Sequence, residues 1–281
     1  MFYNLNAPLI EVRRREELNP ELPYFFSCDS KESFEKGKDK FGTGWYYYNN
    51  PINYEFNSFG YRTSELHEID DNFIVSFGCS FTMGIGLHKK DIWIEKLGEK
   101  LGKKTLNLAL EGVGNSTTFY NSFLFFEWCK KNSIKPDGVF IQLTFNHRRE
   151  FFYTTEEKEI NIGYTPSIIN PTDEHDIDFY QDAQWFKKRY NADSAERTVI
   201  SDIYPKVIKE LWGSIGTPVF FFSFGNDFKK DLLFTNDIEV EEIQLNNLFE
   251  QDYARDLLHN GRKEHELAAS CLALKYQTHN G

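Results

Sequence analysis

The stretch Phe73-Ile-Val-Ser-Phe-Gly-Cys-Ser80-Phe-Thr-Met-Gly84 decides the fold of this chain. Its first five residues are typical of a buried β-strand, and Gly78 after them permits a tight turn. Ser80 then stands where a helix could begin. A serine in that place presents a hydroxyl group and a backbone N–H to a ligand, as a nucleophile and half of an oxyanion hole require. The alternative is that Ser80 only caps the helix.

Apolar runs of strand length recur further along the chain, at residues 105–110, 138–143 and 219–224. Helix-length segments separate or follow them, at residues 91–101, 115–131 and 262–274. Strands and helices that alternate, with strands that are continuously apolar, predict a parallel sheet covered on both faces. We therefore expect an α/β fold: a three-layer α/β/α sandwich with a mainly parallel, flavodoxin-like sheet.

Two parts of the chain do not follow this alternation. Residues 1–70 carry aromatic and turn-forming residues without a sustained period, and we expect an N-terminal extension that wraps the core formed by residues 71–281. A polar, turn-rich insertion at about residues 147–195 leaves from the carboxyl end of a predicted strand, where ligands bind in open α/β sheets. It is predicted to be lid-like. The acidic stretch 239–242 is interpreted as a solvated face.

Composition excludes several classes of protein. With 32 Lys+Arg against 43 Asp+Glu, the 281-residue chain has a net charge of −11, which argues against a nucleic-acid partner. Its apolar runs fall short of the roughly 18 residues that a membrane span needs, and its first residues lack the pattern of a signal peptide. The scattered cysteines predict neither structural zinc nor disulfides. These observations favour a cytoplasmic protein.

Polar or glycine residues follow the next two strands. Gly112 comes just after residues 105–110 and could offer its N–H to a developing oxyanion with no side chain in the way. Asn146 follows residues 138–143 and could donate its side-chain amide to the same oxyanion. The alternatives are an ordinary glycine turn at Gly112 and an Asx turn at Asn146.

A carboxylate and an imidazole lie three residues apart before the last predicted helix. Asp256 and His259 can meet on one turn, so that the carboxylate fixes the imidazole tautomer while the other ring nitrogen faces a serine. The alternative is a turn cap at Asp256 and a solvated His259. Cys79 as a thiol nucleophile is disfavoured because a cysteine at a strand end usually packs as a small apolar residue. The histidines and aspartate at 147, 175 and 176 have no metal-site spacing, and no metal is expected.

Taken in order, these elements resemble the sequence blocks of the SGNH (GDSL-type) hydrolase superfamily, in a divergent branch similar to carbohydrate esterases and acetyltransferases. Residues 78–81 match its Gly-Asp-Ser-Leu block, Gly112 its second block and Asn146 its third, and Asp256 with His259 matches its Asp-x-x-His block. The segment 57–65 looks like the lead-in of carbohydrate-active members. The chain departs from the pattern in having Cys79, Thr144, His147 and Asn260 where the family commonly has Asp, Gly, Asp and Pro.

The resemblance implies a serine hydrolase that cleaves esters, with O-acetyl or short acyl esters on a carbohydrate favoured, and that needs no cofactor. It implies Ser80, His259 and Asp256 as the catalytic triad. The oxyanion hole would comprise the N–H groups of Ser80 and Gly112 and the amide of Asn146. Further candidates for substrate binding are Asn115, His147 and Arg62.

Other functions remain open at this point. The same triad could serve an O-acyltransferase, and the fold could be a catalytically silent module that binds glycan or protein. A nucleotide or flavin binder is disfavoured because no phosphate-cradling loop is present. The oligomeric state does not follow from the sequence.

Overall fold

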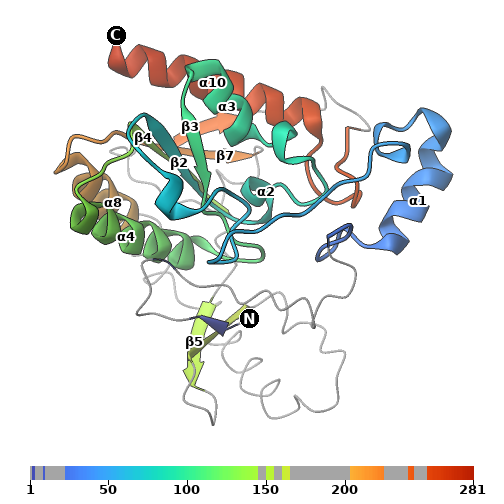
Figure 1. Ribbon diagram of the computed structural model, residues 1–281, viewed down its shortest axis with the longest axis horizontal. Helices are drawn as coiled ribbons and strands as arrows, with labels where there is room; N and C mark the ends of the chain where they lie inside the picture. Colours follow the sequence, from blue (N-terminus) through green and yellow to red (C-terminus); the bar gives the residue numbers. More distant parts are fainter. Residues whose placement is uncertain are drawn as a thin grey trace.

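The computed structural model of the chain describes residues 2–3, 9, 23–144, 150–154, 160–164, 203–224, 240–243 and 252–281. Its central element is a five-stranded sheet in the order β3-β2-β4-β7-β8 (Figure 1). The strands are β2 (Phe73–Phe77), β3 (Lys104–Asn107), β4 (Gly138–Gln142), β7 (Val219–Phe224) and β8 (Val240–Ile243). Every neighbouring pair runs parallel, which confirms the predicted flavodoxin-like sheet.

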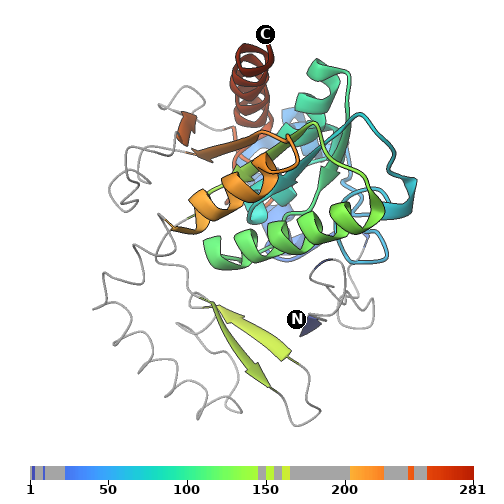
Figure 2. The ribbon, with the colours of Figure 1, turned by 90° about the vertical axis from the view of Figure 1, so that its left-hand side faces the viewer.

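Helices cover both faces of this sheet (Figures 1 and 2). On one face lie α4 (Asn115–Asn132) and α8 (Tyr204–Gly213), and on the other α3 (Trp93–Leu101) and α10 (Arg262–Asn280). Side chains of successive strand residues point to opposite faces. Accordingly Phe77 and Ile141 pack in the cluster that holds Phe125 and Trp212 of α4 and α8. Ile74, Phe140 and Phe222 pack in the cluster that holds Trp93 and Leu272 of α3 and α10. The three-layer sandwich is therefore confirmed.

The strand predicted at residues 105–110 ends earlier, at Asn107, as a hydrogen-bonded strand. Its continuation still lies beside β2, because the backbone N–H of Leu108 donates to Ser76 and that of Leu110 to Gly78, at 2.9 and 3.0 Å. This places the segment that leads to Gly112 at the same edge of the sheet as the turn after β2.

The acidic stretch at residues 239–242, interpreted as a solvated face, includes a strand that was not predicted, and the side chain of Glu241 in it is 38% exposed. Val240–Ile243 form β8, which pairs with Phe221–Phe224 of β7. The side chain of Glu241 forms an ion pair with Lys275 of α10 at 3.0 Å. A carboxylate is tolerated in this edge strand because the helix packed beside it supplies the opposite charge.

The N-terminal part packs on the α3 and α10 face of the sheet. Helix α1 (Lys31–Phe41) begins after Ser30, whose hydroxyl accepts a hydrogen bond from the backbone N–H of Ser33 at 3.1 Å. Four aromatic or aliphatic residues around it are buried in the same cluster as Trp93: Phe26, Tyr47, Ile52 and Tyr54. Residues 23–56 thus share a core with the sheet domain.

Short elements complete the described chain. Helix α2 (Ser80–Met83) follows β2, and single 3₁₀ turns lie at Gly42–Gly44, Tyr46–Tyr48, Leu66–Glu68 and Lys89–Asp91. A second, antiparallel sheet joins β1 (Phe2–Tyr3) to β6 (Ile160–Tyr164), and β6 to β5 (Glu150–Thr154). Most of the predicted insertion at 147–195 lies outside the described residues. Among the helices that are described, we find none with the length and apolar character of a membrane span.

Candidate active site

Ser80, His259 and Asp256 lie in one hydrogen-bonded line at the carboxyl edge of the sheet. The Oγ atom of Ser80, the first residue of α2, lies 2.8 Å from Nε2 of His259. The other ring nitrogen of His259, Nδ1, lies 2.5 Å from Oδ2 of Asp256. Ser80 is only 6% exposed, while the His259 side chain keeps 11% of its surface accessible. This order of hydroxyl, imidazole and carboxylate is the arrangement of a nucleophile, a general base and the group that orients the base.

The carboxylate of Asp256 is held from several directions. Its Oδ1 atom accepts the backbone N–H groups of Leu258 and His259, each at 3.1 Å. Burial acts to raise the pKa of Asp256, but the hydrogen bond and charge of His259, together with these N–H donors, outweigh it, so the pKa lies below its ordinary value. The carboxylate is therefore ionised at neutral pH and accepts the Nδ1–H of His259, which leaves Nε2 to accept the serine proton.

A buried glutamine forms the floor of the turn that carries Ser80. Oε1 of Gln142, at the end of β4, accepts hydrogen bonds from the backbone N–H of Cys79 and the hydroxyl of Thr82, both at 3.1 Å. A Cβ atom on Gly78 would lie 2.8 Å from this oxygen and 2.6 Å from the Thr82 hydroxyl. Only glycine fits between them, so the glycine of the sequence block is required by close approach.

The neighbouring Cys79 faces away from the imidazole. Its side chain is fully buried, with Sγ 3.2 Å from Oε1 of Gln142. Ser80 is the residue of this turn whose side chain forms a hydrogen bond with His259. The geometry thus presents the hydroxyl, and not the Cys79 thiol, to the base.

The two backbone N–H groups predicted for the oxyanion hole are those of Ser80 and Gly112. Gly112 has a positive φ of 69° and no atom within 4 Å of the place where a Cβ would stand, so the space beside it is open. The hydrogen bonds of the described residues include none donated by the N–H of Ser80 or Gly112. Neither amide thus has a hydrogen-bond acceptor among the described residues. Asn146 and His147 lie outside the described residues.

Two predicted substrate-binding residues have structural contacts instead. Arg62 is only 1% exposed, and its guanidinium donates to the carbonyl groups of Gly84 and Leu87 at 2.6 and 2.7 Å while it stacks over the Tyr54 ring. It cannot reach a substrate, and this part of the prediction was wrong: the arginine holds the loop after α2. Asn115 is buried and pairs with the backbone N–H and C=O of Thr144 at 2.8 and 3.1 Å. It fastens the start of α4 to the end of β4.

Sequence reasoning missed the residues that reach Ser80, His259 and Asp256 from distant parts of the chain. Cys28 lies with its Sγ 3.2 Å from Oδ2 of Asp256. The Phe81 ring packs edge-on against the imidazole of His259, with 4.7 Å between the ring centres. Arg255 forms a buried ion pair with Asp29. None of these contacts has a sequence signal, because a cysteine, a phenylalanine or an ion pair at large separation has no spacing that marks it.

One group of side chains in the described part of the chain has the geometry to hold a metal ion. It consists of Cys28, Asp256 and His259, whose ligand atoms lie within 4.8 Å of one another. The same atoms take part in the hydrogen bonds of the triad, since Nδ1 of His259 and Oδ2 of Asp256 face each other. A metal would have to displace the Nδ1 proton, so metal binding and the triad hydrogen bonds exclude each other.

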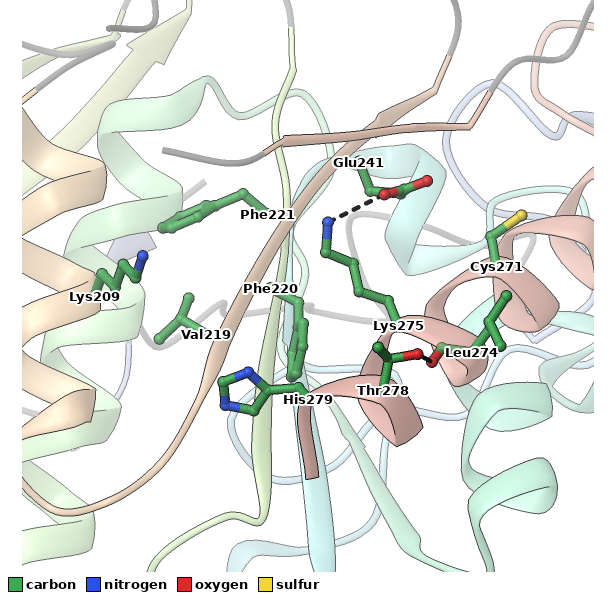
Figure 3. Close-up of a pocket in the computed structure, with 10 residues that line it drawn as sticks. All are labelled: Lys209, Val219, Phe220, Phe221, Glu241, Cys271, Leu274, Lys275, Thr278 and His279. Carbon is green, nitrogen blue, oxygen red and sulfur yellow. Dashed lines mark hydrogen bonds and ion pairs between the residues drawn. The ribbon is translucent and has the colours of Figure 1, made fainter. Parts of the chain in front are cut away.

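Two hollows in the described surface lie elsewhere. A pocket of about 580 Å³ lies between β7, β8, α8 and α10, where Lys275 pairs with Glu241 (Figure 3). A second pocket, of about 450 Å³ and mostly apolar, lies between α4 and α8, beside Phe119 and Tyr204. Neither is lined by Ser80, Asp256 or His259. The candidate active site at Ser80 is thus separate from both pockets.

Comparison with known proteins gives likenesses of structure only. No protein-family model matches the chain, and no curated protein matches its sequence. A solved structure of a lipase from a goat rumen metagenome matches with 13% identity and a TM-score of 0.41, over 72% of this chain and 96% of that one.

Two carbohydrate esterases are also similar in structure. An acetyl xylan esterase from the rumen bacterium Butyrivibrio proteoclasticus matches with 12% identity and a TM-score of 0.44, over 76% of this chain and 65% of that one. A carbohydrate esterase family 2 enzyme with a carbohydrate-binding domain, from Corynascus thermopiles, matches with 14% identity and a TM-score of 0.41, over 74% and 66%. The chain spans about two thirds of the length of these two enzymes. The similar structures also include a putative SGNH hydrolase from Slackia heliotrinireducens, with 12% identity and a TM-score of 0.40.

Proposed function

We propose that this chain is an SGNH-type serine hydrolase that cleaves ester bonds. The observation that carries the proposal is the hydrogen-bonded line from Ser80 through His259 to Asp256, with distances of 2.8 and 2.5 Å. Its members come from positions 80 and 256–259, so local sequence does not bring them together. A capping serine and a solvated histidine would have no reason to meet in this order.

The reaction would proceed through an acyl-enzyme. His259 takes the proton of the Ser80 hydroxyl as its oxygen attacks the ester carbonyl, and Asp256 orients the imidazole and stabilises its charged form. The N–H groups of Ser80 and Gly112, with the Asn146 amide as a third donor, would hold the oxyanion. His259 then returns the proton to the leaving alcohol. Water attacks the acyl-enzyme by the same route and releases the acid and free Ser80.

The favoured substrates are O-acetyl or short acyl esters on a carbohydrate. This preference rests on the resemblance of residues 57–65 to the lead-in of carbohydrate-active members. We further propose residues 71–281 as the hydrolase unit, with residues 1–70 as an extension and a lid-like insertion at about 147–195.

The test is covalent labelling with a serine-reactive fluorophosphonate, followed by turnover of aryl acetates, longer aryl esters and acetylated sugars. Wild-type protein should be labelled at Ser80, and Ser80→Ala should lose labelling and several orders of magnitude of turnover while keeping its fold. Ser270→Ala, which removes an exposed hydroxyl from α10, serves as the matched control. Folded wild-type protein that takes up no probe and hydrolyses no ester would contradict the proposal and favour a silent binding module.

A further inference from the structure

Cys28 contributes the only side chain of the described N-terminal part that donates to the triad carboxylate. Its Sγ lies 3.2 Å from Oδ2 of Asp256, across 228 positions of sequence, and 3.9 Å from Nδ1 of His259. Oδ2 is the same oxygen that faces the imidazole. The thiol therefore lies at the Asp256–Nδ1 end of the hydrogen-bonded triad, whereas Ser80 contacts Nε2 of His259.

The thiol carries its proton and so can only donate to this oxygen. Burial, reinforced by the neighbouring charge of Asp256, raises the pKa of Cys28 to about 12. A thiol is a weak hydrogen-bond donor, but its acceptor here is an ionised carboxylate, which strengthens the bond. A nucleophilic or redox role for this cysteine would instead need a lowered pKa.

The backbone around Cys28 is fixed in place. Phe26 and Asp29 exchange two backbone hydrogen bonds of 3.1 Å across it, and the hydroxyl of Ser33 donates to its carbonyl group at 3.2 Å. The next residue, Asp29, binds the guanidinium of Arg255, which directly precedes Asp256. The turn that carries the thiol and the loop that carries the carboxylate are thus fastened to each other one residue away from the contact.

We propose that Cys28 is a positioning residue for the triad: its thiol holds the Asp256 carboxylate in the orientation that aligns His259 with Ser80. The inference rests on the proposed hydrolase function. In this arrangement Oδ1 receives two backbone N–H groups, and Oδ2 receives the imidazole and the thiol. Without the thiol, Oδ2 has one donor fewer, and the carboxylate and imidazole gain freedom to turn. We expect the loss in the chemical step, because the thiol contacts Asp256 and His259, the groups that would move the proton of Ser80.

The experiment compares Cys28→Ala and Cys28→Val, which lack a donor, with Cys28→Ser, which keeps one. Cys271→Ala is the matched control, since Cys271 is also a half-buried free cysteine but lies on α10 and lines the pocket of Figure 3. We expect kcat for an aryl ester, and the fluorophosphonate labelling rate, to fall roughly threefold to tenfold in the donor-free variants with KM unchanged. Cys28→Ser should recover most of the loss, and Cys271→Ala should equal wild type.

A second measurement follows the triad without turnover. The downfield proton NMR signal of the His259 Nδ1–H, identified by its absence in His259→Ala, should shift in the donor-free variants and stay in place in Cys271→Ala. If the donor-free variants are folded and are labelled at the wild-type rate, the positioning role of Cys28 is overturned and the proposed function stands. The same follows if Cys28→Ser is no faster than Cys28→Ala. If wild-type protein itself is neither labelled nor active, the proposed function falls and the inference with it.

Discussion

The backbone N–H of Trp93 donates to Nδ1 of His265 at 3.0 Å, deep between α3 and α10. His265 is fully buried, and its Nε2 has no hydrogen-bond partner among the described residues. Burial, followed by the nearby charges of His259 and Lys96, lowers the pKa of His265 to about 3. The imidazole is thus a neutral structural group of the core, whereas His259, six positions earlier, contacts Ser80 and Asp256.

His265 should make the protein less stable as the pH falls below neutral. In the unfolded chain it takes up a proton near pH 6.5, whereas the folded protein resists protonation down to about pH 3. The unfolded state therefore binds more protons in this window, and the free energy of unfolding falls as the pH drops through it. We expect a loss of about 2 kcal/mol between pH 6.5 and 5.

The measurement is the free energy of unfolding of wild type and His265→Gln from pH 5 to 8, by urea denaturation. Glutamine keeps an acceptor for the Trp93 N–H but does not titrate. The difference between the two proteins removes the contribution of other groups, such as Glu264, whose pKa burial raises to about 7. If the free energies of unfolding of the two proteins changed in parallel from pH 5 to 8, His265 would not be the cause of the loss of stability at low pH.

The ion pair of Asp29 and Arg255 should be worth far more than those on the surface. Nε and Nη2 of Arg255 lie 2.9 and 2.8 Å from the two carboxylate oxygens of Asp29, and the side chains are 2% and 0% exposed. Removing one member of a buried pair leaves the other charge buried without compensation, which costs about 3–5 kcal/mol. We expect Asp29→Asn to destabilise the protein by that amount.

Asp70→Asn is the matched control for this substitution, because its partner Lys104 and Asp70 itself are 59% and 68% exposed. An exposed pair contributes at most about 1 kcal/mol. Thermal unfolding of both variants beside wild type gives the comparison. Equal shifts in Tm would mean that Asp29 does not anchor the loop before Asp256.

The fold could be predicted where the sequence pattern reflects burial on both faces of the sheet. The runs at Phe73–Phe77 and Val219–Phe224 are apolar except for one serine in each, and the observed strands have these bounds. Strand β8 was missed because it contains Glu241, which the pairing with Lys275 makes tolerable. Helix α1 was missed because it buries only Gly37, so it has no apolar period to detect. A Cβ on that glycine would lie 2.2 Å from the Trp45 ring.

The candidate site could be predicted where its members sit in short blocks. Ser80 follows a strand and a glycine, and Asp256 precedes His259 by one turn, so local spacing marked them as candidates. The resemblance of the ordered blocks to the superfamily was needed to join them into one site. The supporting contacts lie beyond the reach of such reasoning, because they join residues 28 and 256, or 79 and 142. Arg62 shows the opposite error: a charged residue in a motif-like segment holds backbone carbonyl groups in the interior.

Gln142 should support the turn of Ser80 through its side-chain oxygen. Replacing it by Met keeps the length of the side chain but removes the acceptor for the Cys79 N–H and the Thr82 hydroxyl. A buried donor left without an acceptor costs roughly 1–3 kcal/mol. We expect Gln142→Met to lower the free energy of unfolding by that amount or more, and to slow fluorophosphonate labelling at least tenfold as Ser80 loses its position. Gln277→Met, on the exposed end of α10, is the control and should leave the free energy of unfolding and the labelling rate unchanged.

Asn146 tests the third donor of the proposed oxyanion hole. It lies two positions beyond Thr144, whose backbone is pinned by Asn115 and whose hydroxyl has no partner among the described residues. The end of β4 is thus held close to the start of α4, at the edge of the sheet where Ser80 lies. Removing one oxyanion donor typically costs about 10²–10³ in rate. We expect Asn146→Ala to lower kcat by that factor with little change in KM, since the charge it stabilises is absent from the ground state. Steady-state kinetics and a thermal scan of the variant distinguish an oxyanion donor from a turn former. If Asn146 only formed a turn, its replacement would lower Tm and leave kcat unchanged.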